Sequence, residues 1–258
     1  MKSRLALPAV TTVALAGGVV FACSDSTPPH PVDKSGTFFG AVTQMAGGSG
    51  RAYVTLDREG APTDLGVALT EGALTGLPTT APEFVFALPA EASVTPYKHA
   101  VVNWQPVGHP PPGVYNVPHF DVHFYMITDQ QRQAITAADP EYPAKVARQP
   151  AAEFIGAGYA AGMGSERMGL HWNDPTAPER QGQPFTMTFI YGSYDGVVTF
   201  GEPMVAKSFL ETKPARSETP IKLPSKYAAT GYQPTTYVVY YDQPTKEYRV
   251  ALTGLVRR

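Results

Sequence analysis

The segment from Pro118 to Met126 constrains the fold most strongly, because its polar and apolar residues alternate strictly. The polar positions are His119, Asp121, His123 and Tyr125, and the apolar ones are Phe120, Val122, Phe124 and Met126. Successive side chains of a β-strand point to opposite faces of the sheet. The segment therefore predicts a strand with one apolar face and one face of imidazole, carboxylate and phenol groups. The polar face is then either exposed to solvent or part of a site.

Further strand-like runs, bounded by Gly, Pro and Asp, indicate a mainly β protein. They cover residues 37–43, 51–56, 65–69, 83–88 and 98–104 before this strand, and 185–191, 197–200, 235–241 and 247–252 after it. Asp57 to Gly60 and Asp195-Gly196 are typical hairpin turns. We expect an antiparallel sandwich or barrel.

A small helical insertion is expected at about 128–160. Thr128 and Gln131 fit a capping box, which predicts a helix from there to Ala138. Short helical turns are expected at 142–148 and 151–155. We assign residues 37–210 to the main β domain, and residues 211–258 to a linker and a C-terminal hairpin that packs on it.

The N-terminus has the features of an export signal. Basic residues at Lys2 and Arg4 precede an apolar run, and Cys23 follows it. Val20-Phe21-Ala22-Cys23 resembles a bacterial lipobox, in which the cysteine is lipidated, although Phe21 is bulkier than usual and plain cleavage or retention stays an alternative. We expect a signal peptide over 1–22, a tether over 23–36, and a lipid anchor that holds the protein to a membrane of the cell envelope, outside the cytoplasm.

Composition excludes several classes of function. Cys23 is the single cysteine, so the folded part has no thiolate zinc site, iron–sulfur cluster or cysteine nucleophile. The 22 acidic residues outnumber the 18 basic ones that remain once Lys2 and Arg4 are removed, a net charge of about −4, which is not the balance of a nucleic-acid-binding protein. The sequence leaves open whether the protein forms a homo-oligomer.

The polar strand face can contribute ligands to a metal ion. His119 and His123 are about 13 Å apart along a strand, too far to share one ion easily, whereas His119/Asp121 and Asp121/His123 are only about 7 Å apart. A remote residue must complete such a site. The candidates are His171, which we expect within about 8 Å of Asp121 or of one strand histidine, and His109 and Glu202 at the margin. These ligand types suit zinc, iron or manganese.

Two readings without a metal compete with this one. The histidines and Asp121 can form a buried hydrogen-bonded network that fixes the fold, or the polar face can be exposed. His99, on an earlier strand beside Lys98, is expected to be structural.

Several segments together resemble a bacterial exported domain family of unknown function, first described in a thermophile protein and often found in lipoproteins. The resemblance covers about residues 37–210. The segments are Thr95 to His99, Val102 to His109, Pro112 to Tyr115, the Pro-His-Phe-Asp-x-His-Phe-Tyr motif from Pro118 to Tyr125, Met168 to Trp172, and Phe189 to Gly196 with Glu202 to Met204. The resemblance implies an envelope location and a mainly β fold. It carries over no catalytic residues to this chain.

Three functions stay in competition. The favoured one is an envelope lipoprotein that binds a metal ion or small ligand without turnover. The second is a metal-dependent hydrolase or lyase, in which a metal-bound water reacts and Glu202 or Asp121 accepts a proton. The third is a non-catalytic structural protein with a buried polar network.

Overall fold

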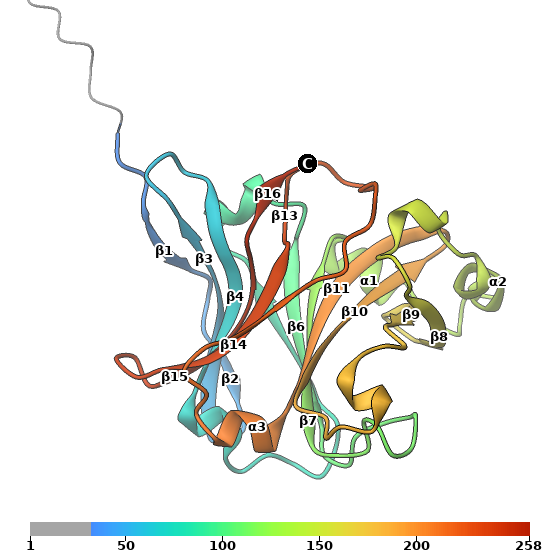
Figure 1. Ribbon diagram of the computed structural model, residues 1–258, viewed down its shortest axis with the longest axis horizontal. Coiled ribbons are helices and arrows are strands. Elements are labelled where there is room, and N and C mark those ends of the chain that lie inside the picture. The colour runs from blue at the N-terminus through green and yellow to red at the C-terminus, as the bar shows by residue number, and fades with distance from the viewer. Residues whose placement is uncertain (1–31) are drawn as a thin grey trace, which may run out of the picture. The chain divides into compact units, whose positions relative to one another are not determined.

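Two antiparallel sheets face each other in the computed structural model, which describes residues 32–258 (Figure 1). The predicted mainly β fold is confirmed. Neither sheet closes on itself in this part of the chain, so of the two predicted forms the sandwich is the one observed. The predicted signal peptide, Cys23 and residues 23–31 of the tether lie outside the described residues.

The first sheet has the strand order β1-β3-β4-β15-β14-β12, with β2 paired to β3. Its strands are β1 (Gly36–Phe39), β2 (Thr43–Met45), β3 (Gly48–Leu56), β4 (Pro62–Thr70), β12 (Ser217–Pro220), β14 (Thr236–Asp242) and β15 (Glu247–Thr253).

The second sheet has the order β5-β6-β7-β11-β10-β9-β8. Its strands are β5 (Glu83–Ala87), β6 (His99–Gln105), β7 (His119–Tyr125), β8 (Ala160–Ser165), β9 (Gly169–Asn173), β10 (Met187–Tyr194) and β11 (Val197–Ala206). The short strands β13 (Tyr232–Gln233) and β16 (Val256–Arg257) pair with each other.

Short helices connect the strands. The α-helices are α1 (Asp129–Gln133), α2 (Tyr142–Ala147) and α3 (Lys207–Glu211), and the 3-10 helices are η1 (Glu71–Leu74), η2 (Ala90–Val94), η3 (Ala152–Phe154) and η4 (Pro178–Gln181). Among the described residues, no helix is long and apolar enough to cross a membrane.

The C-terminal hairpin is an integral part of the first sheet. β15 pairs with β4 over seven residues, from Glu247 opposite Thr70 to Thr253 opposite Asp64. The hairpin therefore lies in the interior of the sheet, and the segment 211–258 contributes β12, β14 and β15 to it. Strands from both sides of residue 210 thus form one sheet.

The main core lies between the sheets, and the apolar face of β7 belongs to it. Phe120, Val122 and Phe124 are at most 1% exposed and pack in one cluster with side chains of the first sheet such as Val67 and Val250. The predicted face assignment of this strand is therefore confirmed. The polar face of β7 is buried too, since all seven residues of the strand are shielded from solvent. The alternative of an exposed polar face is wrong.

The helical insertion begins as predicted but is less helical. The Thr128 hydroxyl accepts a hydrogen bond from the Gln131 amide at 3.2 Å, and the Gln131 side chain accepts one from the Thr128 amide at 2.9 Å, which completes the capping box. α1 ends at Gln133 rather than at Ala138. Beyond the helix, Ile135 is buried and the Ala137 amide donates to Glu166 in place of a helical carbonyl.

The hairpin of β8 and β9 follows the insertion in a region for which we predicted no strand. β8 is rich in alanine and glycine and exposed along its whole length, so its sequence has no periodic apolar signal. By contrast, the predicted β10–β11 hairpin is confirmed, with Asp195 and Gly196 at φ of 54° and 80° in its turn.

Candidate metal centres

The six residues proposed from the sequence gather in two groups on the face of the second sheet that points away from the first. In each group, one ligand atom from every residue lies within 4.8 Å of the others. The first group is His109, His119 and Asp121, and the second is His123, His171 and Glu202. Each group thus offers two imidazoles and one carboxylate.

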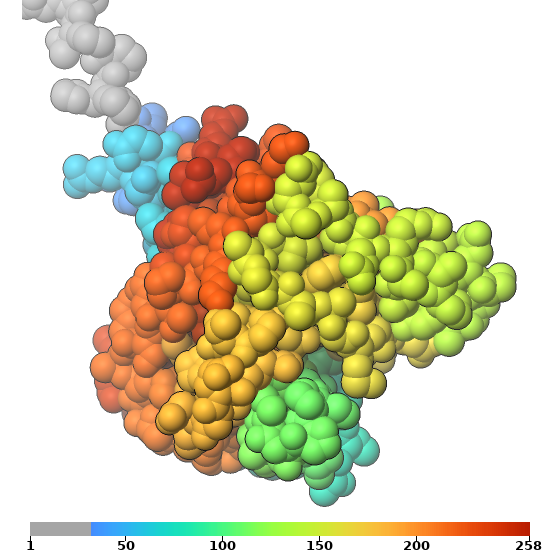
Figure 2. Space-filling model, turned by 45° about the vertical axis from the view of Figure 1, so that its right-hand side comes forward, coloured from blue at the N-terminus to red at the C-terminus, as the bar shows by residue number. Residues whose placement is uncertain are grey.

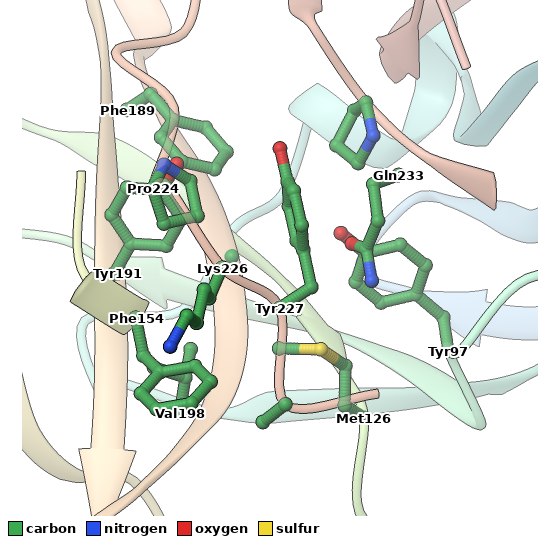
Figure 3. Close-up of a pocket in the computed structure, with 13 residues that line it drawn as sticks. Tyr97, Met126, Phe154, Phe189, Tyr191, Val198, Pro224, Lys226, Tyr227 and Gln233 are labelled. Carbon is green, nitrogen blue, oxygen red and sulfur yellow. The ribbon is translucent and has the colours of Figure 1, made fainter. Parts of the chain in front are cut away.

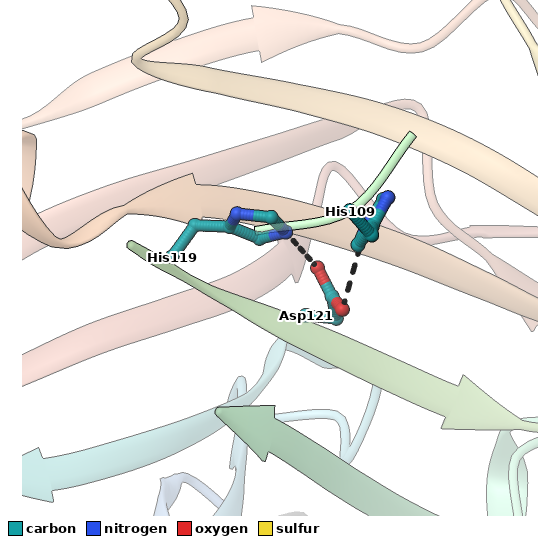
Figure 4. Close-up of side chains that lie close together, drawn as sticks. All are labelled: His109, His119 and Asp121. Atoms are coloured by element: carbon teal, nitrogen blue, oxygen red, sulfur yellow. Dashed lines mark ion pairs between the residues drawn. The ribbon is translucent and has the colours of Figure 1, made fainter. Parts of the chain in front are cut away.

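The first group is centred on Asp121, whose two carboxylate oxygens face different histidines (Figure 4). His119 Nε2 lies 3.0 Å from Asp121 Oδ1, and His109 Nε2 lies 3.7 Å from Asp121 Oδ2. The Gln105 side chain donates a hydrogen bond of 3.0 Å to Oδ2. The carboxylate is thereby held in one orientation between the two rings.

His109 reaches this group because the loop between β6 and β7 folds back on itself. The His109 amide donates to the carbonyl of Tyr115 at 3.1 Å. Gly108 before it has a φ of +71°, and a Cβ at this position would lie 2.0 Å from the Tyr115 carbonyl oxygen. Only glycine fits so close an approach with this backbone, so the loop closure that positions His109 depends on Gly108.

The second group joins three strands around Glu202. His123 Nε2 lies 3.2 Å from Glu202 Oε2, and His171 Nε2 lies 4.0 Å from the same oxygen. Glu202 is on β11, which pairs with β7, and His171 is on β9, which pairs with β10 on the far side of β11. The Phe200 ring packs against both imidazoles, at 4.8 Å from His123 and 5.6 Å from His171 between ring centres.

Backbone carbonyls orient three of the four imidazoles. His109 Nδ1 lies 2.8 Å from the Pro110 carbonyl, His119 Nδ1 lies 2.7 Å from that of Val117, and His171 Nδ1 lies 3.0 Å from that of Met163. A carbonyl can only accept, so Nδ1 carries the proton and donates. In the neutral ring Nε2 then has a free lone pair, and in all three residues Nε2 is the atom that faces a carboxylate. Histidine ligands of metal ions are commonly oriented in this way.

The facing nitrogen and oxygen atoms are close together but do not hydrogen-bond to each other. Four of them are buried and have no hydrogen-bond partner among the described residues: His119 Nε2, Asp121 Oδ1, His123 Nε2 and Glu202 Oε2. Buried polar atoms are nearly always hydrogen-bonded. Nitrogen and oxygen atoms in this arrangement have the proximity that a shared cation would require.

Electrostatics favours the charged forms of His109 and Asp121. Burial lowers the pKa of His109, but the nearby Asp121 carboxylate outweighs it and raises the pKa to about 9. Burial in turn raises the pKa of Asp121, but His109 and His119 together hold it far below its usual range. Asp121 is therefore an anion at neutral pH.

The histidines of the second group differ from each other. Burial lowers the pKa of His123, but attraction from the nearby Glu202 carboxylate outweighs it, so that the pKa rises. For His171 burial dominates and the pKa falls. A neutral His171 is already in the form that binds a metal ion.

Both groups border one cavity of about 680 Å³, whose wall includes His109, Asp121, His171 and Glu202. In Figure 2 the loop between β6 and β7 forms a separate green lobe beside the gold segment that precedes β10. A ligand in this cavity can approach either group.

A second cavity, between strands β10 and β11 of the second sheet and residues 224–234, has a different chemistry (Figure 3). Its lining is mostly aromatic and apolar and includes Tyr97, Phe189, Tyr191 and Tyr227, with Lys226 as its charged residue. No histidine or carboxylate lines it, so it offers no ligand set for a metal ion.

The structure differs from the sequence-based arrangement in how it divides the residues. His171 joins His123 and Glu202, whereas Asp121 belongs to the other group. His109 and Glu202 are members of the groups and do not lie at a margin. The reason is the strand repeat: Asp121 and His123 are two residues apart, so each recruits a different neighbour.

Sequence reasoning missed several polar residues that line the cavity, among them Asn103, Gln105 and Arg180. Asn103 and Gln105 alternate with Val102 and Trp104 on β6 and lie opposite Asp121 and His119. Their alternation is a signal that could have placed them on the polar face. Arg180 is in η4, in an irregular segment without periodicity, and nothing in the sequence indicated it.

Comparison with known proteins gives a family of unknown function over part of the chain. Residues 57–104 match a family model described as TTHB210-like, hypothetical protein TTHB210. No curated protein and no solved structure matches the chain. The matched segment runs from the turn before β4 to Trp104 in β6, and so ends before the residues of both groups. Over this segment the chain is similar to an uncharacterised family.

Proposed function

We propose that this protein is an exported envelope lipoprotein that binds divalent transition-metal ions at two centres, each built from two histidines and one carboxylate. One observation carries the metal sites. His109, His119 and His171 each donate Nδ1–H to a backbone carbonyl and so turn Nε2 toward Asp121 or Glu202. A polar cluster without a ligand is not expected to orient three imidazole rings in the same way.

The distances between ligand atoms support this proposal. Donors about 2.0–2.1 Å from a metal ion are roughly 3.3 Å apart in a tetrahedral site and roughly 2.9 Å apart in an octahedral one. His119 and Asp121 are 3.0 Å apart, and His123 and Glu202 are 3.2 Å apart. The His109–Asp121 and His171–Glu202 pairs, at 3.7 and 4.0 Å, need to close by at most about 1.1 Å.

Zinc, iron and manganese all suit the ligand set, because imidazole nitrogens and carboxylate oxygens bind each of them. Three protein ligands also leave at least one coordination position for water or another molecule. This favours a metal-dependent hydrolase or lyase as the second candidate. Asp121 and Glu202 would then be metal ligands, so the proton acceptor would be another group.

The test is metal analysis of the purified full-length protein after it is offered zinc, iron(II) or manganese. We expect two ions per chain in the wild type and one in Asp121→Asn and in Glu202→Gln. Glu179→Gln is the matched control, because Glu179 is also a buried carboxylate but accepts a hydrogen bond from Tyr115 at 3.0 Å and lies outside both groups. It should retain two ions. A wild type that takes up none of the three metals would leave a structural polar network as the function of these residues.

A further inference from the structure

Arg180 is a cation of the cavity without a carboxylate partner among the described residues. Its Nε is buried and has no hydrogen-bond partner in this part of the chain, and its guanidinium lies 5.4 Å from the centre of the Tyr115 ring. Arg167 lines the same cavity but is paired with Glu83 at 2.9 Å. A guanidinium that faces a cavity unpaired is suited to binding an oxyanion.

Asn103 adds a second unpartnered polar group. Its residue is 7% exposed, it lines the cavity, and its Oδ1 has no hydrogen-bond partner among residues 32–258. Asn103 pairs with Asp121 across β6 and β7, so it lies next to the first metal group. A polar group of a bound molecule can therefore reach Asn103 and a metal ion together.

The rest of the wall is largely apolar. It includes Pro110, Pro111, Met163, Met168, Ile190 and Met204. The cavity also contains Glu166, but this carboxylate already accepts hydrogen bonds from Thr136 and from the Ala137 amide. The wall thus offers an apolar surface between an unpaired cation and the metal groups.

The charge of the metal-loaded cavity favours an anion. In each group the positive charge of a divalent ion exceeds the negative charge of the single carboxylate that holds it. Arg180 adds another positive charge. An anionic ligand is stabilised by this excess, and a neutral one of the same shape is not.

We propose that the cavity binds a small amphipathic organic anion, with its carboxylate or phosphate on Arg180, its apolar body along the proline and methionine wall, and its path leading to Asn103 and the metal centres. This inference rests on the proposed metal-binding function, since it makes the anion the molecule that meets the bound ions.

The experiment titrates the full-length protein, loaded with cobalt(II) as a spectroscopic probe, with hexanoate, hexyl phosphate and 1-hexanol. We expect both anions to bind and hexanol to bind at least 10-fold more weakly. Preference between the two anions identifies the head group. Arg180→Gln should lower anion affinity roughly 10- to 100-fold, and Arg180→Lys should restore part of it. Arg167→Gln, in the same cavity, should bind like the wild type.

Metal content separates the two hypotheses. Each variant should hold as much cobalt as the wild type, because Arg180 is not a metal ligand. If the wild type holds cobalt but hexanol binds as tightly as hexanoate, or Arg180→Gln binds anions unchanged, the anion site is refuted and the metal proposal stands. If the wild type holds no cobalt, the metal proposal fails, and calorimetric titration of the metal-free wild type and Arg180→Gln with the same three compounds still decides whether Arg180 binds anions.

Discussion

Removal of one histidine from each group tests whether the two centres are separate. His171→Ala removes a ligand of the second group and His109→Ala one of the first. Both side chains are partly exposed, at 17% and 34%, and lie outside the apolar core. Each substitution removes one hydrogen bond to a backbone carbonyl, which costs about 1 kcal/mol in chelator. His109→Ala should cost more than this, because it also removes the attraction between His109 and the buried Asp121 carboxylate.

Adding the metal ion should make the difference in stability between the wild type and the variants large. A ligand that binds only the folded state at 100 times its Kd adds about 2.7 kcal/mol to the free energy of unfolding. Two centres therefore add about 5.4 kcal/mol in the wild type, each single variant gains about half of that, and the double variant gains nothing. For a domain of this size, about 2.7 kcal/mol corresponds to a rise in Tm of roughly 5–11 °C.

The assay is thermal unfolding of each protein in chelator and in buffered zinc, so that every variant is its own control. The increase in Tm on adding zinc should be about twice as large in the wild type as in either variant. An increase in His171→Ala equal to that of the wild type would show that the second group holds no ion. Loss of the whole increase in either single variant would show one shared centre in place of two.

Three further predictions concern the anchor, the core and acid stability. Cys23→Ser should prevent lipidation, so the variant should leave the detergent phase and the membrane fraction; equal processing and partition of both proteins would contradict a lipid anchor. Phe124→Ala should lower the free energy of unfolding by about 3–5 kcal/mol in denaturant titrations, because Phe124 is fully buried between the sheets, and a loss under about 1 kcal/mol would be inconsistent with that packing. Burial lowers the pKa of His99 to about 4. The unfolded chain therefore binds the extra proton first, and stability should fall as pH drops from about 6.5 to 4, by up to about 3 kcal/mol. His99→Phe, whose ring can still stack on Tyr125, should flatten this slope, and an unchanged slope would assign it to other groups.

Local patterns were sufficient to predict the elements around the site. The alternation of β7 fixes which side chains share a face, because a strand has a repeat of two. The Asp195-Gly196 turn and the Thr128 capping box depend on a few neighbouring residues, and both are present. Such features are decided within four or five residues, so they are visible in the sequence.

The division into two groups depends on pairings that the sequence does not show. Glu202 meets His123 because β11 pairs with β7 across some eighty residues, with Gly201 opposite Phe124. His171 lies on β9. This strand pairs with β10 on one side and, on the other, with the glycine-rich β8, which has no apolar pattern. Patterns of residue types in the sequence indicated the candidate side chains, whereas the order of the strands determines which of them are neighbours.

The buried polar face of β7 has an energetic cost that bears on its function. A strand buried on both faces is ordinarily apolar on both, yet here His119, Asp121 and His123 are at most 3% exposed. Each buried polar atom without a partner costs about 1–3 kcal/mol, and four such atoms together amount to a large part of the 5–15 kcal/mol that typically stabilises a domain. Apolar residues at these positions would form a more stable sheet. A cation coordinated by Nε2 of the histidines and by the carboxylate oxygens would satisfy the same four atoms, so the proposed metal binding would account both for the placement of these residues and for the stability that they cost.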